Sequence, residues 1–250
     1  MEKRQLGKTD MQVSRLGSGL SEIGYGGIDE KRAAEVLNNA LDLGINFLDT
    51  AACYNVSEEF VGKSVAHRRT EYYLATKAGH VAGGYEGEPW TAKTITDSID
   101  RSLKRMNTDY LDLVQLHSCG LDVLQKGEAI EALQKAQQEG KTRYIGYSGD
   151  NDAAVWAVES GLFDTLQTSF NLVEQKARHT LFDKIREKGM GLIIKRPIAN
   201  SAWGASSSPS AYADGYFERA QKLRALGPIE NEPDDRILLA LGFTFAHDVV

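Results

Sequence analysis

Two kinds of hydrophobic pattern alternate along this chain. In one, apolar residues recur at helical spacing, as at Ile95, Ile99, Leu103 and Met106. In the other, a short run is continuously apolar, as at Leu192–Ile194. Spacing of three or four residues predicts a helix with one buried face, whereas a short apolar run predicts a strand covered on both faces.

Glycine residues mark the junctions between these patterns. Gly44, Gly140, Gly161 and Gly189 each stand where a predicted helix ends and a strand follows, because glycine readily adopts the positive φ of a helix C-terminus. The predicted strands lie near Arg15–Gly19, Ile45–Leu48, Tyr72–Thr76, Leu111–Leu116, Tyr144–Tyr147, Thr165–Thr168 and Leu192–Ile194. The predicted helices are Glu30–Leu43, Glu58–Ala66, Thr94–Met106, Glu128–Glu139, Asp152–Ser160, Lys176–Lys188, Tyr216–Leu226 and Asp235–Ala246.

Strict alternation of strand and helix predicts a parallel sheet with right-handed crossovers. A doubly wound sheet would alternate in the same way, but no Gly-x-Gly-x-x-Gly turn joins the first strand to the first helix. We therefore expect one domain over residues 1–250, an α/β fold of the (β/α)8 TIM-barrel type. Such a barrel has eight strands and only seven are predicted, so we expect its last βα unit to be missing from this chain.

Two further segments complete this prediction. Arg4–Leu6 and Gln12–Ser14 flank a turn and predict a β-hairpin ahead of the first barrel strand. Pro197 to Ala213 is rich in small residues and predicts a long surface loop after the seventh strand. Long loops in compact domains are often functional.

The composition changes this picture little. The chain is 42% hydrophobic and 26% charged, with a formal net charge of −6 and no basic run longer than three residues, so no nucleic-acid partner is expected. No apolar stretch approaches the roughly 20 residues that span a bilayer, and the polar N-terminus is unlike a signal peptide. Cys53 and Cys119 are too few for a disulfide framework and indicate free thiols in a reducing cytoplasm.

Ionisable side chains stand at the ends of the predicted strands, where barrels of this kind carry their chemistry. Asp49, Lys77 and His117 end the second, third and fourth strands, and Tyr54 follows Asp49 by five residues. Each alone has an ordinary structural explanation. Together they place a carboxylate, an ammonium group, an imidazole and a phenol on one rim.

This set suits the reduction of a carbonyl group. A hydride acceptor needs a proton donor for the developing alkoxide, and a free tyrosine with a pKa near ~10 exchanges its proton poorly at neutral pH. We expect Lys77 to lower the pKa of Tyr54, and Asp49 to keep Lys77 charged. His117 can hold the carbonyl oxygen, and the chemistry needs no metal.

Five segments in chain order resemble the aldo-keto reductase family. They are INFLDTAACYNVSEEFVG, EYYLATKAGH, TDYLDLVQLHS, GKTRYIGYSG and LQTSFNL, which together extend over most of the chain. The resemblance implies a monomeric carbonyl reductase with NADPH/NADP+ as cofactor, NADH being the alternative. It also implies a catalytic set made of Asp49, Tyr54, Lys77 and His117.

The resemblance further implies a cofactor site on the later strands. Ser148 and Gln167 would contact the nicotinamide carboxamide, and the loop from Arg196 through Pro197 to Trp203 would cover the pyrophosphate. Gly149 stands where the family usually has asparagine. Lys195 stands where it usually has a stacking aromatic residue, so we expect it either to favour the reduced cofactor or to contact an anionic group.

Loops after the first, third and fourth strands would form the wall for a small-molecule carbonyl substrate, with Tyr25 and Trp90 as candidates. Trp90 could equally pack on the helix that follows it. Two other functions remain open: a slow or non-catalytic NADP(H)-binding regulatory subunit, and an aldolase that forms a Schiff base through Lys77 or Lys195.

Overall fold

The computed structural model describes residues 1–250 and contains a seven-stranded parallel sheet curled into a barrel. The strands pair in chain order. They are β3 (Ser18–Gly19), β4 (Phe47–Asp49), β5 (Tyr73–Ala78), β6 (Leu111–His117), β7 (Thr142–Ser148), β8 (Thr165–Ser169) and β9 (Gly191–Lys195). All seven predicted strands are present, which confirms the barrel prediction.

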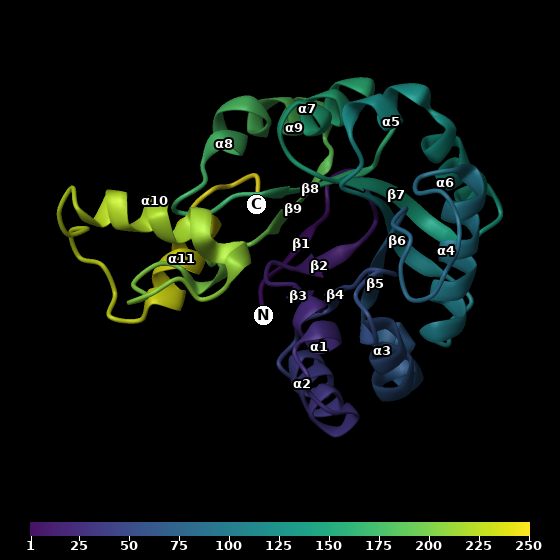
Figure 1. Cartoon of the computed structure of the whole chain (residues 1–250), viewed down its shortest axis with the longest axis horizontal. Helices are drawn as coiled ribbons and strands as arrows, with labels where there is room; N and C mark the ends of the chain where they lie inside the picture. Colours follow the sequence, from purple (N-terminus) through teal and green to yellow (C-terminus); the bar gives the residue numbers. More distant parts are fainter.

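Helices form a ring outside this sheet (Figure 1). They are α1 (Ser21–Tyr25), α2 (Glu30–Asp42), α3 (Ser57–Val65), α4 (Ala92–Arg105), α5 (Leu121–Lys126), α6 (Glu128–Gln138), α7 (Asn151–Ser160), α8 (Lys176–Thr180) and α9 (Phe182–Lys188), with a 3-10 turn at Ala66–Glu71. The predicted helix Lys176–Lys188 is two helices, because Leu181 leaves helical geometry at φ −126° and ψ −38°. The short helices α1 and α5 were not predicted.

The N-terminal hairpin of β1 (Lys3–Gln5) and β2 (Gln12–Ser14) covers the bottom of the barrel. Its buried residues Leu6 and Met11 pack with Phe47, at the start of β4. Gly7, in the turn, has φ 55°, and a Cβ atom there would lie 2.1 Å from the Gly191 nitrogen. Only glycine therefore allows this turn to close against β9.

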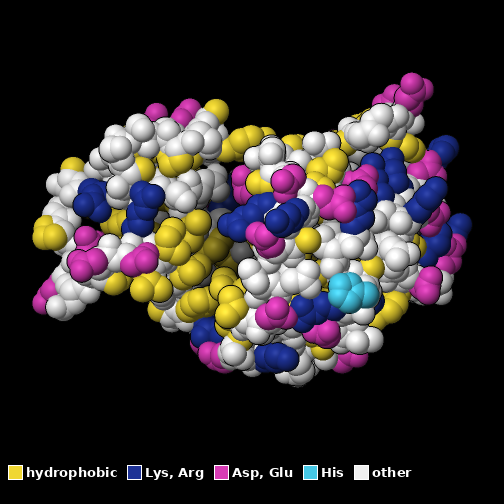
Figure 2. All heavy atoms as spheres, turned by 90° about the horizontal axis from the view of Figure 1, so that it is seen from below, with side chains coloured by type: hydrophobic (Ala, Val, Ile, Leu, Met, Phe, Trp, Pro, Cys, Tyr) yellow, Lys and Arg dark blue, Asp and Glu magenta, His cyan; other side chains and the backbone are white.

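The main core is a cluster of 38 buried residues between the sheet and the helix ring. β9 and β3 do not pair with each other, so the barrel is open between them. Two further helices, α10 (Asp214–Arg224) and α11 (Arg236–Phe245), form a lobe beside the barrel together with the 3-10 turns Ala199–Ser201 and Ala211–Ala213. Figure 2 shows a hollow between this lobe and the barrel, with hydrophobic side chains along its edge.

The segment after α11 returns to the barrel. Arg15 donates to the carbonyl oxygen of Phe245 at 2.7 Å, and Arg186 forms an ion pair with Asp248 at 2.9 Å. These contacts tie the lobe to the segment between β2 and β3 and to α9. No helix in the structure combines the length and apolarity needed to cross a membrane.

Candidate active site

The parallel register brings the polar strand ends together at the carboxyl end of the sheet. Lys77 on β5 pairs with Gln115 on β6, and His117 on β6 pairs with Ser148 on β7. Ser148 in turn pairs with Gln167 on β8. Residues far apart in the sequence thus form one continuous rim.

A buried ion pair forms the centre of this rim. The Lys77 ammonium donates to Asp49 Oδ2 at 2.7 Å and to the Thr50 carbonyl oxygen at 2.8 Å, and its side chain is only 1% exposed. Burial alone would lower the pKa of Lys77, but the negative charge of Asp49 and the neighbouring Tyr54 raise it above its usual value. Lys77 is therefore an ammonium ion, as predicted.

Tyr54 lies beside this pair, in the loop between β4 and α3. The Lys77 Nζ atom is 5.0 Å from the centroid of the Tyr54 ring. Burial raises the pKa of Tyr54, and the nearby ammonium opposes this rise without cancelling it. Lys77 thus acts on the pKa of Tyr54 in the expected direction, but removing the phenol from water outweighs the ammonium and leaves the net pKa raised.

His117 completes the predicted set from the end of β6. Its ring centroid lies 5.6 Å from that of Tyr54, at an interplanar angle of 79°. Burial lowers the pKa of His117 to about 2, and the charges of Lys77 and Lys195 add to the effect, as does His80. The imidazole is therefore neutral and keeps one N–H donor. Its Nδ1 atom lies 3.3 Å from the Cys53 sulfur.

Aromatic rings extend from this set on both sides. On one side, His80 lies 4.8 Å from His117 and Trp90 lies 4.9 Å from His80, measured between ring centroids. Trp90 is also packed against the main core, so both of the roles considered for it have a structural basis. On the other side, the Tyr25 ring lies 6.0 Å from the Tyr54 ring. Tyr25 also donates to the Cys53 carbonyl oxygen.

The two residues expected at a nicotinamide carboxamide are bonded to each other. Ser148 donates to Gln167 Oε1 at 2.8 Å, and Gln167 Nε2 donates to Asp49 Oδ2 at 3.0 Å. Both side chains are buried. A continuous hydrogen-bonded chain thus runs from β7 through β8 to the Asp49–Lys77 pair.

Lys195, at the end of β9, contacts an anionic group of the protein itself. Its ammonium lies 3.0 Å from Asp150 Oδ2. Asp150 also accepts from Thr168 Oγ1 at 2.9 Å and from the Ser169 backbone N–H at 2.7 Å. Of the two alternatives expected for Lys195, the structure shows the contact with an anionic group. This group is the carboxylate of Asp150, which the sequence analysis does not single out.

The loop after β9 has a strained backbone. Arg196, Ala199, Asn200 and Ser201 have φ values of 59°, 49°, 50° and 62°, a region that costs residues other than glycine roughly 1 kcal/mol or more each. Such strain clusters at ligand-binding segments. The exposed Arg196 contacts Ser169 Oγ at 3.3 Å and has no carboxylate within ion-pairing distance, and half-buried Pro197 follows it.

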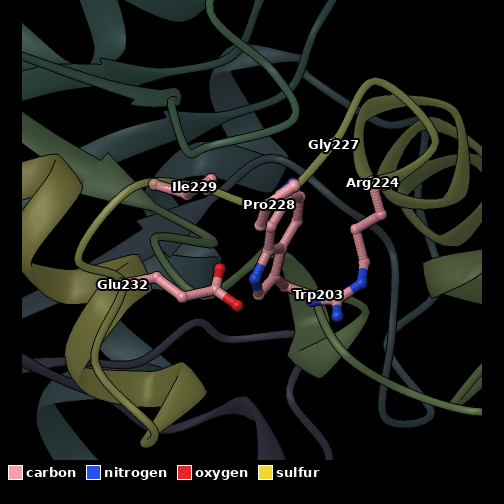
Figure 3. A pocket seen from close by; sticks show the side chains of 6 residues that line it. All are labelled: Trp203, Arg224, Gly227, Pro228, Ile229 and Glu232. Atoms are coloured by element: carbon pink, nitrogen blue, oxygen red, sulfur yellow. The ribbon is translucent and has the colours of Figure 1, made fainter.

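Trp203 does not present its ring at the rim. It is 5% exposed and belongs to a small core of the lobe with Val173 and Tyr216. The Arg224 guanidinium lies 5.4 Å from the Trp203 ring, and both residues line a cavity of about 170 Å³ whose lining includes none of the four proposed catalytic residues (Figure 3). The buried indole anchors the loop, and the contact of this loop with the cofactor pyrophosphate stays a prediction.

Sequence reasoning missed several members of the site. Gln115 donates to Asp49 Oδ1 at 3.3 Å, and the Thr50 carbonyl oxygen binds Lys77. Gln115 could have been found, because it precedes His117 by two residues on one strand and so faces the same side. A backbone contact such as that of Thr50 leaves no signal in the residue types.

The geometry weighs against the aldolase alternative at Lys77. A lysine that forms a Schiff base must act as a neutral amine, whereas Lys77 is paired with Asp49 and its pKa is raised. Lys195 is paired with Asp150, but burial lowers its pKa despite this pair. No group of three or more His, Cys, Asp or Glu side chains in the structure could hold a metal ion.

Known proteins share this arrangement of strands. A sequence model described as "Aldo/keto reductase family" matches residues 15–232. The chain belongs to the aldo/keto reductase family. It is 33% identical to aldo-keto reductase AKR11C1 from Bacillus halodurans, with a TM-score of 0.83 to the holo form, over 100% of this chain and 84% of that one.

Curated members of the aldo/keto reductase family match at similar levels. The uncharacterized oxidoreductase YqkF of Bacillus subtilis is 34% identical over 82% of this chain and 64% of its own length. L-galactose dehydrogenase of Arabidopsis thaliana is 34% identical over 80% of this chain and 66% of its own length. The chain therefore spans about two thirds of the length of these relatives.

Proposed function

We propose that this chain reduces aldehydes and ketones to alcohols in a reversible reaction, with NADPH as the hydride donor and Tyr54 as the proton donor. The observation that carries this proposal is the buried Asp49–Lys77 ion pair beside the Tyr54 phenol. Its arrangement fits proton transfer to a developing alkoxide, and the relatives named as oxidoreductases or dehydrogenases point the same way.

Each residue of the set has a distinct part in this reaction. Tyr54 is neutral before the reaction and gives its phenolic proton to the carbonyl oxygen of the substrate. The Lys77 ammonium then stabilises the phenolate left behind, while Asp49 holds Lys77 in place. Neutral His117 donates an N–H to the same carbonyl oxygen, and it cannot compete as an acid at neutral pH.

The residues at the ends of β7 to β9 fit a nicotinamide dinucleotide. When bound, that group would supply the hydride. Ser148 and Gln167 offer a hydroxyl group and an amide at the rim, which suits a carboxamide. Arg196, without an ion-pair partner and next to a strained backbone, suits a phosphate. NADPH rather than NADH is inferred from the family resemblance.

Aromatic and imidazole rings frame the proposed substrate position. Tyr25 lies on one side of Tyr54, and His80 and Trp90 extend the other side beyond His117. A working monomer is inferred from the family resemblance. The free thiols of Cys53 and Cys119 support a reducing compartment such as the cytoplasm.

Titration of NADPH with the protein, followed by the cofactor's fluorescence, tests the proposed cofactor. We expect saturable binding, tighter than for NADH, that weakens about tenfold or more in Arg196→Met because charge-assisted hydrogen bonds are lost. Arg224→Met is the matched control, since that guanidinium lies against Trp203 in the lobe. Absence of saturable binding by folded protein would contradict the proposal.

A further inference from the structure

Glu58 is a buried carboxylate with no part in the proton transfer described above. It lies in the first turn of α3, four residues after Tyr54, and its side chain is 1% exposed. Its Oε1 atom accepts from Thr76 Oγ1 at 2.8 Å, and its Oε2 atom lies 3.4 Å from Arg105 Nη1. Burial of a carboxylate is costly even when it is paired, so these contacts call for an explanation beyond packing.

The two partners of the Glu58 carboxylate contact the segments that carry Lys77 and Tyr54. Thr76 directly precedes Lys77 on β5. Arg105 Nη1 also donates to the carbonyl oxygen of Ala52 at 3.2 Å, two residues before Tyr54. The Ala52 N–H donates to the Lys77 carbonyl oxygen at 3.1 Å. These contacts form a closed circuit through β5, the loop after β4 and the last turn of α4.

We propose that Glu58 is a positioning residue, whose carboxylate holds Arg105 on the Ala52 carbonyl and thereby fixes Tyr54 relative to Lys77. It acts through Arg105 and Thr76 and does not touch the reacting atoms. This inference rests on the proposed function, because the main effect of Glu58 is measured as the rate of carbonyl reduction. A second readout, independent of turnover, follows from Cys53.

The neighbouring Glu59 is a matched control within the same turn. Glu59 Oε1 lies 3.0 Å from Arg105 Nε, so it pairs with the same guanidinium. Its side chain is 36% exposed, and it makes no hydrogen bond to β5. A general loss of negative charge beside Arg105 would affect both glutamates, whereas a positioning role belongs to Glu58 alone.

The first readout is the split between kcat and KM for carbonyl reduction. We expect Glu58→Gln to lower kcat about tenfold or more, because a misplacement of about 1 Å in a reacting group can cost 10²-fold. The KM for the carbonyl and the Kd for NADPH should change by less than about twofold, since no binding group is removed. Glu59→Gln should keep the wild-type kcat.

The second readout is alkylation of Cys53 by iodoacetamide as a function of pH. Cys53 is half-buried and directly precedes Tyr54, whereas Cys119 is 2% exposed and should stay unlabelled. Burial is the largest cause that raises the pKa of Cys53; the Lys77 ammonium opposes it, and Glu58 adds to it. The Nδ1 atom of His117 also faces the sulfur. Glu58→Gln should therefore move the alkylation midpoint to lower pH.

Together, a lowered kcat and a lowered alkylation midpoint in Glu58→Gln, with neither change in Glu59→Gln, would support the inference. It would be overturned if Glu58→Gln changed only the melting temperature, or if both glutamate variants behaved alike. Should Glu58→Gln not fold, Thr76→Val carries the kcat test, because it removes the other hydrogen bond of the carboxylate at similar volume. If the wild type shows no turnover, the proposed function fails, and the alkylation comparison then tests separately whether the charge of Glu58 acts on the loop that carries Cys53 and Tyr54.

Discussion

Replacement of Lys77 by methionine tests the electrostatic part of the proposed reaction. The Lys77 Nζ atom lies 5.0 Å from the Tyr54 ring centroid. A unit charge at that distance stabilises a phenolate by about 3 kcal/mol at an effective dielectric constant of about 20. Since about 1.4 kcal/mol corresponds to a tenfold change in rate, Lys77→Met should lower kcat by about 10²-fold.

Stability must be separated from catalysis in this experiment. Lys77→Met leaves the partly buried Asp49 without its counter-ion, which costs up to about 3–5 kcal/mol of stability. The double variant Asp49→Asn/Lys77→Met removes both charges and should regain most of that stability, but not the rate. The assay is the decrease in NADPH absorbance with a reactive aldehyde, alongside thermal unfolding. A folded Lys77→Met protein that retained the wild-type kcat would refute the reasoning.

Three further predictions follow from individual side chains. Lys195→Met should strengthen the binding of NADP+ relative to NADPH by about threefold or more in paired titrations, because a cation is removed beside the positively charged oxidised ring. An unchanged ratio of the two dissociation constants would contradict this prediction. The His117 imidazole should show no NMR titration between about pH 5 and 8, because its pKa of about 2 leaves it neutral there; a midpoint near ~6.5 would contradict the burial argument. Asp112→Asn should destabilise the fold by about 3 kcal/mol in urea unfolding, because this 2% exposed carboxylate binds two arginines. The control Asp97→Asn should shift the midpoint far less, because the half-exposed Asp97 pairs only with the exposed Lys93.

The barrel could be predicted because its determinants are local. Continuous apolar runs such as Leu192–Ile194 and terminal glycines such as Gly161 define each βα unit without knowledge of distant contacts. The break at Leu181 was missed because apolar spacing continues across it. Short helices such as α5 lack enough turns to show a period.

The site was predicted unevenly for a related reason. Strand ends gather at one face in any parallel barrel, so Asp49, Lys77 and His117 could be placed together from the sequence. The direction of the Tyr54 pKa shift depends on how much water is excluded, and no residue pattern reports that. Likewise, the burial of Trp203 follows from the packing of α10, which the sequence of the loop does not reveal.

Multiple-turnover oxidation of NADPH with a reactive aldehyde, by the wild type and by Tyr54→Phe, tests the central claim most directly. The phenylalanine variant keeps the aromatic ring and loses only the phenolic proton. The account predicts steady turnover by the wild type, and turnover reduced by about 10²-fold or more in Tyr54→Phe with unchanged NADPH binding. Equal turnover by both proteins would contradict the assignment of Tyr54 as the proton donor.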